Sequence, residues 1–213
     1  QRAPLPRRRL TTEIREGLAF VVRHPAISRI TVASCISNFA STATFTLAPI
    51  IVLRLLDLGA VNYGVLMTVG AVGGLGGAAV AGRLERRFGT ADTVRFSILL
   101  GSLMTFAYPI ALLFDDKWAA MGVLLAAGAV GGFAQLIYNV TQMSVRQRLC
   151  PPHLLGRMNA SVRFIVWGIM PVSALTAGWA GEALGIGNLM WITAALGVLA
   201  FAPLWHLRRH LAN

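Results

Sequence analysis

Residues 118–157 read WAAMGVLLAAGAVGGFAQLIYNVTQMSVRQRLCPPHLLGR, and their pattern recurs along the whole chain. The first part, 118–145, carries no charged side chain. As a helix it is long enough to cross the roughly 30 Å of hydrocarbon in a bilayer. Arg146 and Arg148 follow this apolar run, and Pro151 and Pro152 cannot continue a helix. The stretch therefore predicts a membrane-spanning helix followed by a basic loop.

Five more apolar runs of similar length lie on either side of this one. The chain has 213 residues, a mean hydropathy of +0.66 and only 13% charged residues, about half the share of a soluble domain. Short links between the runs make neighbouring spans antiparallel. The sequence thus predicts an all-α membrane protein with six transmembrane helices, at about 28–55, 62–84, 91–114, 118–145, 154–184 and 188–207.

The basic residues gather in alternate gaps between the runs. Seventeen of the 19 lie in the N-terminal segment, the second-to-third gap, the fourth-to-fifth gap, their flanks and the C-terminus. Only Arg54 and Lys117 fall on the other side. This positive-inside distribution predicts that both termini are cytoplasmic, in the inner (plasma) membrane of a cell. A net charge of +11 could also suit nucleic acid. Because the charges alternate with spans, we expect anionic membrane lipids as partners and no nucleic acid.

The N-terminal part, 1–26, is expected to be a cytoplasmic linker that holds an amphipathic helix over 11–24, and the six-helix domain is expected to occupy 27–213. Ile14, Leu18, Val21 and Val22 share one face of that helix, which suits the membrane interface. The basic, proline-containing start without Met predicts a piece of a longer protein. The two cysteines predict no disulfide, and the chain has no metal-ligand spacing.

Glycines form a second pattern. GxxxG pairs occur at Gly70/Gly74, Gly73/Gly77, Gly128/Gly132 and Gly181/Gly185. Small residues allow helix backbones to approach closely in lipid. The pattern predicts close helix packing, and the alternative is a surface along which helices slide.

Three stretches carry a family resemblance: REGLAFVVRHPAISR (15–29), GRLERRFG (82–89) and RQRLCPPHLLGRMNASVR (146–163). With them, the whole chain resembles the C-terminal six-helix half of a major facilitator superfamily (MFS) transporter, in particular bacterial enterobactin exporters and macrolide-efflux-type proteins. The resemblance implies twelve helices in two halves, each built of three-helix inverted repeats, with the substrate between the halves. It also implies that the partner is a missing N-terminal half or a second copy of this chain.

The resemblance includes the family's cytoplasmic signature G-x-L-x-D-R-x-G-R-R. Gly82, Leu84, Arg87 and Gly89 match it, whereas Arg86 stands at the position of the signature's Asp. Only the adjacent Glu85 could supply a carboxylate there. The loop is therefore interpreted either as a conformational latch or as a set of topology-determining arginines.

Polar residues at mid-span are few, and no ionisable residue other than Tyr and Cys lies near the middle of a span. Gln135, Asn139 and Gln142 share one helical face, which we expect to point inward because an unsatisfied amide facing lipid costs several kcal/mol. The resemblance implies that Asn38, Gln135 and Asn139 contact the substrate and that Gln142 also lines the cavity. Phe45, Tyr138 and Trp167 would form apolar walls. The alternative is that these amides only join helices.

The leading hypothesis is therefore half of a secondary transporter that exports a small amphipathic molecule, a drug or siderophore-like compound, by alternating access. The alternatives are a self-dimerising half transporter and the membrane domain of an ATP-driven exporter, although the chain has no P-loop. We expect no enzyme and no cofactor. An intramembrane protease would need a deep Ser–His pair, and all four histidines lie at span margins.

Overall fold

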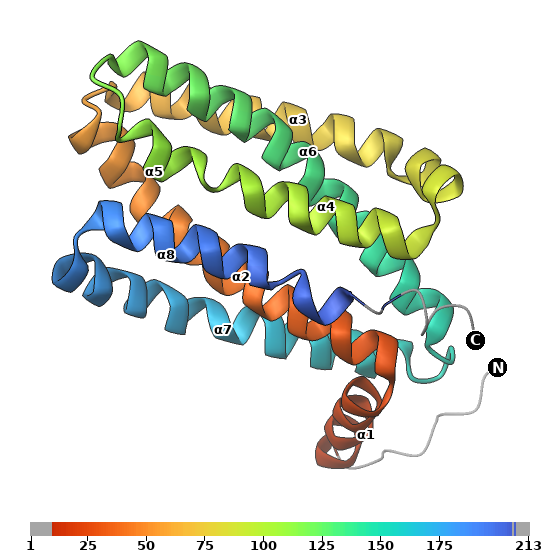
Figure 1. Ribbon diagram of the computed structural model, residues 1–213. Helices are drawn as coiled ribbons and strands as arrows, with labels where there is room; N and C mark the ends of the chain where they lie inside the picture. Colours follow the sequence, from red (N-terminus) through yellow and green to blue (C-terminus); the bar gives the residue numbers. More distant parts are fainter. Residues whose placement is uncertain (1–9, 206, 208–213) are drawn as a thin grey trace.

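The structure, a computed structural model, describes residues 10–205 and 207, and every element in that part of the chain is a helix. After α1 (Leu10–Arg23) come six helical segments (Figure 1). They are α2 (Pro25–Ile50) with its π-helical continuation Ile51–Leu55, α3 (Gly59–Phe88), α4 (Thr90–Met104) with α5 (Ala107–Ala111), α6 (Lys117–Leu149), α7 (Leu155–Leu184), and α8 (Ile186–Leu199) with the 3-10 turn Ala202–Leu204.

Within the described residues, these six segments are long and apolar enough to cross a membrane. The prediction of an all-helical bundle with six spans is confirmed. The helices extend beyond several predicted spans, because hydropathy marks only the part that hydrocarbon would cover. Segment 82–88, whose last residues were predicted as a connection, is the end of α3, and Arg146 and Arg148 lie in the last turn of α6 rather than in a loop. These helices stop at Gly89 and just before Pro151.

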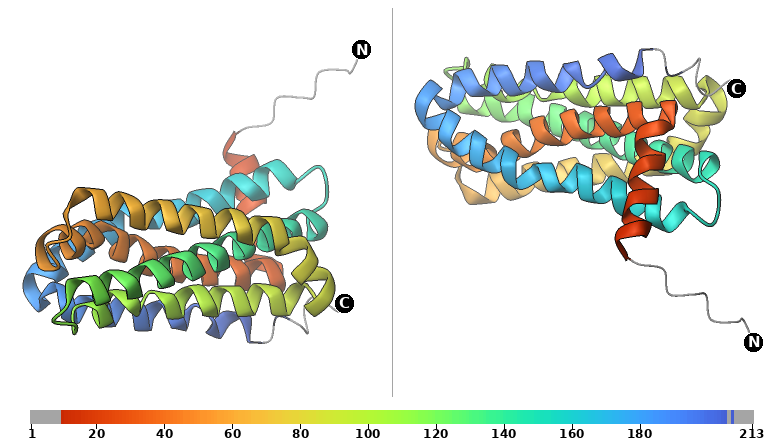
Figure 2. Two further views of the ribbon diagram at one scale, coloured as in Figure 1. Left: turned by 90° about the horizontal axis from the view of Figure 1, so that it is seen from above. Right: turned by 90° about the horizontal axis from the view of Figure 1, so that it is seen from below.

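The six segments form two groups of three (Figures 1 and 2). In one group α6 packs against α3 and α4, and in the other α2 packs against α7 and α8. The groups meet along α4 and α8. In chain order, the first span thus packs with the fifth and sixth spans, and the fourth span packs with the second and third. In each group, one span therefore contacts both of two spans that follow each other in the sequence.

The two groups also share a turn. Gly89 separates α3 from α4 and Gly185 separates α7 from α8, with φ of +82° and +81°. A side chain is strained at such angles, and glycine is not. The same kind of glycine turn therefore reverses the chain between the second and third spans (α3 and α4) and between the fifth and sixth spans (α7 and α8). The two turns lie at opposite ends of the bundle.

Close packing of α3 on α6 depends on the glycines of the GxxxG pattern. A Cβ atom on Gly73 would collide with the Ala129 carbonyl oxygen, and one on Gly77 with that of Phe133. A Cβ on Gly132 would collide with the Gly70 carbonyl oxygen. The prediction of close packing is confirmed for this helix pair.

Helix α1 lies across one end of the bundle, roughly perpendicular to the long helices in both Figure 1 and Figure 2. It packs on α7 through Gly17, where a Cβ would lie 2.6 Å from Ser161 Oγ. Gly17 and Val21 are buried, whereas Val22 is 65% exposed and Leu18 is also exposed. The helix thus packs on α7 through Gly17 and Val21, and the location of Leu18 and Val22 at the membrane interface stays a prediction. The Ile14 side chain and the linker 1–9 lie outside the described residues.

We call the end of the bundle that holds α1 the basic end, because most described arginines lie there: Arg15, Arg23, Arg29, Arg83, Arg86, Arg87, Arg95, Arg146, Arg148, Arg157 and Arg163. Arg54 and Lys117 lie at the opposite end. The N-terminal arginines 2, 7, 8 and 9 and the C-terminal pair 208–209 are outside the described residues. The charges are thus segregated by end, and the cytoplasmic location of the basic end remains a prediction.

Candidate functional site

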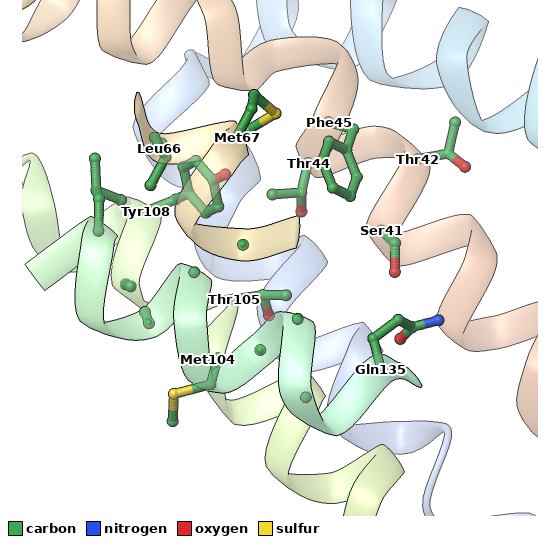
Figure 3. Close-up of a pocket in the computed structure, with 18 of the residues that line it drawn as sticks. Ser41, Thr42, Thr44, Phe45, Leu66, Met67, Met104, Thr105, Tyr108 and Gln135 are labelled. Carbon is green, nitrogen blue, oxygen red and sulfur yellow. The ribbon is translucent and has the colours of Figure 1, made fainter. Parts of the chain in front are cut away.

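A cavity of about 650 Å³ lies between α2 on one side and α3, α4, α5 and α6 on the other (Figure 3). It occupies the seam between the two groups of helices. α2 forms one wall and supplies most of the hydroxyl groups that line the cavity. The opposite wall is formed mainly by small and apolar residues. The lining residues include Asn38, Ser41, Thr44, Phe45, Met67, Met104, Tyr108 and Gln135.

The α2 wall presents hydrogen-bond acceptors. Ser41 Oγ donates to the Ser37 carbonyl at 2.6 Å, and Thr44 Oγ1 donates to the Ala40 carbonyl at 3.1 Å. Asn38 Nδ2 donates to the Ser34 carbonyl at 2.8 Å, which leaves its Oδ1 available. Because these donors are already used within the helix, the wall offers oxygen lone pairs to an occupant.

The opposite wall holds polar groups without a partner. Gln135 of α6 is exposed, and its amide makes no hydrogen bond within the described chain. In Figure 3 its side chain extends into the space between α6 and α2, toward which Ser41 also points. Among described residues, the Tyr108 hydroxyl likewise has no partner. Both groups can therefore bond to an occupant without first breaking a protein contact.

The rest of the lining is apolar and adaptable. Phe45 is 59% exposed and lines the cavity together with Met67, Met104 and Met170. Methionine side chains adjust to ligands of different shape. No Asp, Glu, Lys, Arg or His lines the cavity, and the described residues contain no cluster of His, Cys, Asp and Glu that could hold a metal.

Three of the seven predicted substrate residues, Asn38, Phe45 and Gln135, line this cavity. Tyr138, predicted as an apolar wall, is 2% exposed and shares a 2.8 Å hydrogen bond with Ser34 between α6 and α2, outside the lining of this cavity. Trp167 is outside the described lining of this cavity, is 60% exposed and lies 5.4 Å from the Arg163 guanidinium, so its role as an apolar wall stays a prediction. Helical spacing places residues on a face, but it does not identify the neighbouring helix.

Below the cavity, the predicted amide face continues toward the basic end. Gln142 Nε2 donates to Asn139 Oδ1 at 3.4 Å, and Arg146 Nη2 donates to Gln142 Oε1. Since a guanidinium only donates, Arg146 fixes which way the Gln142 amide points. The Asn139 amide then keeps its NH₂ group as a donor on an exposed surface. Asn139 and Gln142 thus lie beside the cavity rather than in its lining.

Arg146 is the residue that the sequence analysis missed. Its side chain is 6% exposed, it has no ion pair among the described residues, and its Nε has no hydrogen-bond partner there. We assigned it to a loop because the apolar run ends before it. Its position eleven residues after Gln135, on the same helical face, could have identified it.

The predicted signature residues form the end of α3 and the glycine turn. Gly82, Leu84, Arg86 and Arg87 are helical, and Gly89 forms the turn. Glu85 accepts a hydrogen bond from Thr90 Oγ1 at 2.8 Å and pairs with Arg148 Nη1 at 2.9 Å. Glu85 therefore ties the α3–α4 turn to the end of α6, within one group of helices.

A family model described as Major Facilitator Superfamily matches residues 1–174. No curated protein and no solved structure matches the chain.

Proposed function

The chain belongs to the major facilitator superfamily, a family of membrane transporters, and we propose that it moves a small amphipathic molecule through the cavity between α2 and α6. The observation that carries this proposal is the lining of that cavity. It combines apolar and methionine side chains with the free Gln135 amide and the Asn38 oxygen, and none of its described lining side chains is charged at neutral pH. Such a lining favours a largely apolar molecule with a few polar atoms.

Alternating access would open the cavity to each side of the membrane in turn. It requires a second six-helix unit, either an N-terminal half or a second copy of this chain, opposite α2 and α6. Exposed polar and aromatic side chains near the cavity, among them Phe45, Gln135 and Asn139, support this placement. We further propose export, with the basic end in the cytoplasm, in line with the resemblance to efflux proteins.

A coupling ion would need a group that this cavity lacks. Proton-coupled carriers use ionisable side chains within the membrane, and none of the described residues that line the cavity is a carboxylate or a histidine. If transport is coupled to protons, the second six-helix unit would supply the group that carries the proton.

The test is efflux from cells that lack their own multidrug pumps, measured with a panel of fluorescent amphipathic dyes. We expect the protein to lower accumulation of at least one dye, and Phe45→Ala and Gln135→Ala to reduce that effect. Phe164→Ala and Gln147→Ala are matched controls, because both residues are exposed and outside the cavity. Unchanged accumulation of every dye, or an equal loss in the controls, would contradict the proposal.

The energy source is tested in inverted membrane vesicles. A secondary transporter accumulates the dye when an ion gradient is imposed without ATP. Accumulation that requires ATP and resists collapse of the gradient would instead favour the membrane domain of an ATP-driven exporter.

A further inference from the structure

A second hollow, of about 750 Å³, lies at the basic end and is separate from the transport cavity. Three segments enclose it: the end of α1, the short link from α1 into α2, and the loop that leads into α7. Its lining residues are Glu16, Ala19, Phe20, Arg23, His24, Pro25, His153, Leu154 and Arg157.

The wall that α1 forms is held in place by close contacts with α7. A Cβ on Gly17 would lie 2.7 Å from the Arg157 carbonyl oxygen, so the helices touch backbone to backbone. Beside this contact, Glu16 Oε2 and Arg157 Nη1 form an ion pair of 2.6 Å. The hollow is therefore part of the packed structure of this end of the bundle.

The lining has an excess of positive charge and donor groups. It contains two arginines and two histidines against the single carboxylate of Glu16. Arg23 and His153 are exposed and make no hydrogen bond or ion pair within the described chain. His24 Nδ1 accepts the Ile27 N–H at 3.5 Å, so in the neutral ring the proton lies on Nε2 as a donor.

The start of α7 adds backbone donors beside these side chains. Its N-cap residue, Leu154, lines the hollow and provides no side-chain cap. The first-turn N–H groups therefore lack a capping side chain at the positive end of the helix dipole. An anion in the hollow would lie close to this positive helix end as well as to the arginines and histidines.

We propose that this hollow binds a phosphate group. Guanidinium groups bind phosphate oxygens through charge-assisted, paired hydrogen bonds, and Arg23, His24 and His153 could contact several oxygens at once. The hollow lies at one end of the candidate membrane-spanning helices, where phospholipid headgroups would be. On α1, the exposed Leu18 and Val22 lie opposite the face formed by Glu16, Phe20 and Arg23. When Leu18 and Val22 face hydrocarbon, the hollow opens toward the headgroups and the water beyond them.

The phosphate could come from a phospholipid or from a soluble phosphate ion. Native mass spectrometry of the detergent-purified protein titrated with phosphatidylglycerol measures lipid binding, and diacylglycerol provides the same acyl chains without phosphate. We expect retention of phosphatidylglycerol only, and an affinity reduced about tenfold for each charge-assisted hydrogen bond lost in the R23Q/H153Q variant. Titration with inorganic phosphate, against chloride at equal ionic strength, tests the soluble source.

The matched control is Arg83→Gln, because Arg83 is exposed at the same end but lies outside the hollow. Neither Arg23 nor His153 has a partner among the described residues, so the melting temperature of R23Q/H153Q should equal that of the wild type. Loss of phosphatidylglycerol binding without competition by phosphate identifies a headgroup site, and competition identifies a site open to soluble phosphate. Unchanged binding of both ligands in R23Q/H153Q, or an equal loss in Arg83→Gln, would overturn the proposal.

Discussion

At the scale of single residues, Gln135 and Tyr138 differ in whether the protein already uses their hydrogen-bonding groups. They lie three residues apart on α6. Gln135 lines the cavity between α2 and α6 with an amide that has no partner in the described chain, whereas the Tyr138 hydroxyl is buried at 2.8 Å from Ser34 Oγ. A polar group without a protein partner is available to a ligand, and a buried bonded group stabilises the fold. A change at Gln135 should therefore affect mainly transport, and a change at Tyr138 should affect mainly the stability of the fold.

Gln135→Ala should reduce dye efflux and leave the free energy of unfolding within about 0.5 kcal/mol of the wild type, because no internal hydrogen bond is lost. Tyr138→Phe should lower that free energy by about 1 kcal/mol, because the buried 2.8 Å hydrogen bond between the Tyr138 and Ser34 hydroxyls is lost. Unfolding of the purified protein in mixed micelles and efflux from whole cells provide the two readouts. A destabilised Gln135→Ala variant that keeps full efflux would contradict this assignment.

Arg146 leads to a second contrast. Removing a buried arginine usually destabilises a protein because a carboxylate is left unpaired, but no described carboxylate pairs with Arg146. Replacement of buried charges by apolar residues is often neutral or stabilising. We therefore expect Arg146→Met to leave the unfolding free energy unchanged or to raise it by about 1 kcal/mol.

Efflux by Arg146→Met should nevertheless fall, because Gln142 loses the donor that orients its amide and, through it, that of Asn139. Arg146→Lys keeps a donor and should retain more activity. A loss of about 3 kcal/mol or more in Arg146→Met would indicate an acidic partner and refute the assignment.

At the scale of elements, the contact of α3 with α6 depends on backbone proximity. Gly77→Ala should lower the free energy of unfolding by about 1–3 kcal/mol, because the new methyl group would collide with the Phe133 carbonyl and push the helices apart. Gly64→Ala, on the same helix, is the control. No atom lies within 4 Å of a Cβ at Gly64, so this variant should gain about 0.4–1 kcal/mol. Equal stability of the two variants would show that the close contact is not required.

The elements also show what could be predicted from the sequence. Span number followed from hydrocarbon thickness, which sets a length that six runs satisfy. The ends of the helices could not be predicted in this way. Arg146 and Arg148 end the apolar run of α6, but the helix itself continues through both residues. In the site, periodicity placed Gln135 on an inward face of its helix, and the structure has it in the cavity lining. Periodicity could not show that Tyr138 contacts α2, since that depends on which helices are neighbours.

At the scale of the whole molecule, the grouping of helices places the cavity where movement would change access to it. α3, α4 and α6 form one packed group, and α2, α7 and α8 form the other. The Glu85–Arg148 ion pair lies within the first group, so it holds that group together without joining it to the second. A rotation between the groups would alter the distance between α2 and α6, and with it the cavity that they line.

The segregation of basic residues to one end of the molecule predicts its orientation in the membrane, which cysteine labelling can measure. Asp115→Cys and Gln147→Cys place one thiol at each end, and both positions are exposed. The native Cys35 and Cys150 are replaced by Ser. Burial raises the pKa of the Cys150 thiol, so at neutral pH less of it is the reactive thiolate, and the maleimide would label it poorly. Because basic loops stay in the cytoplasm, a membrane-impermeant maleimide should label Asp115→Cys in intact cells and Gln147→Cys only after lysis. The reverse labelling would place the basic end, and the phosphate site proposed there, outside the cytoplasm.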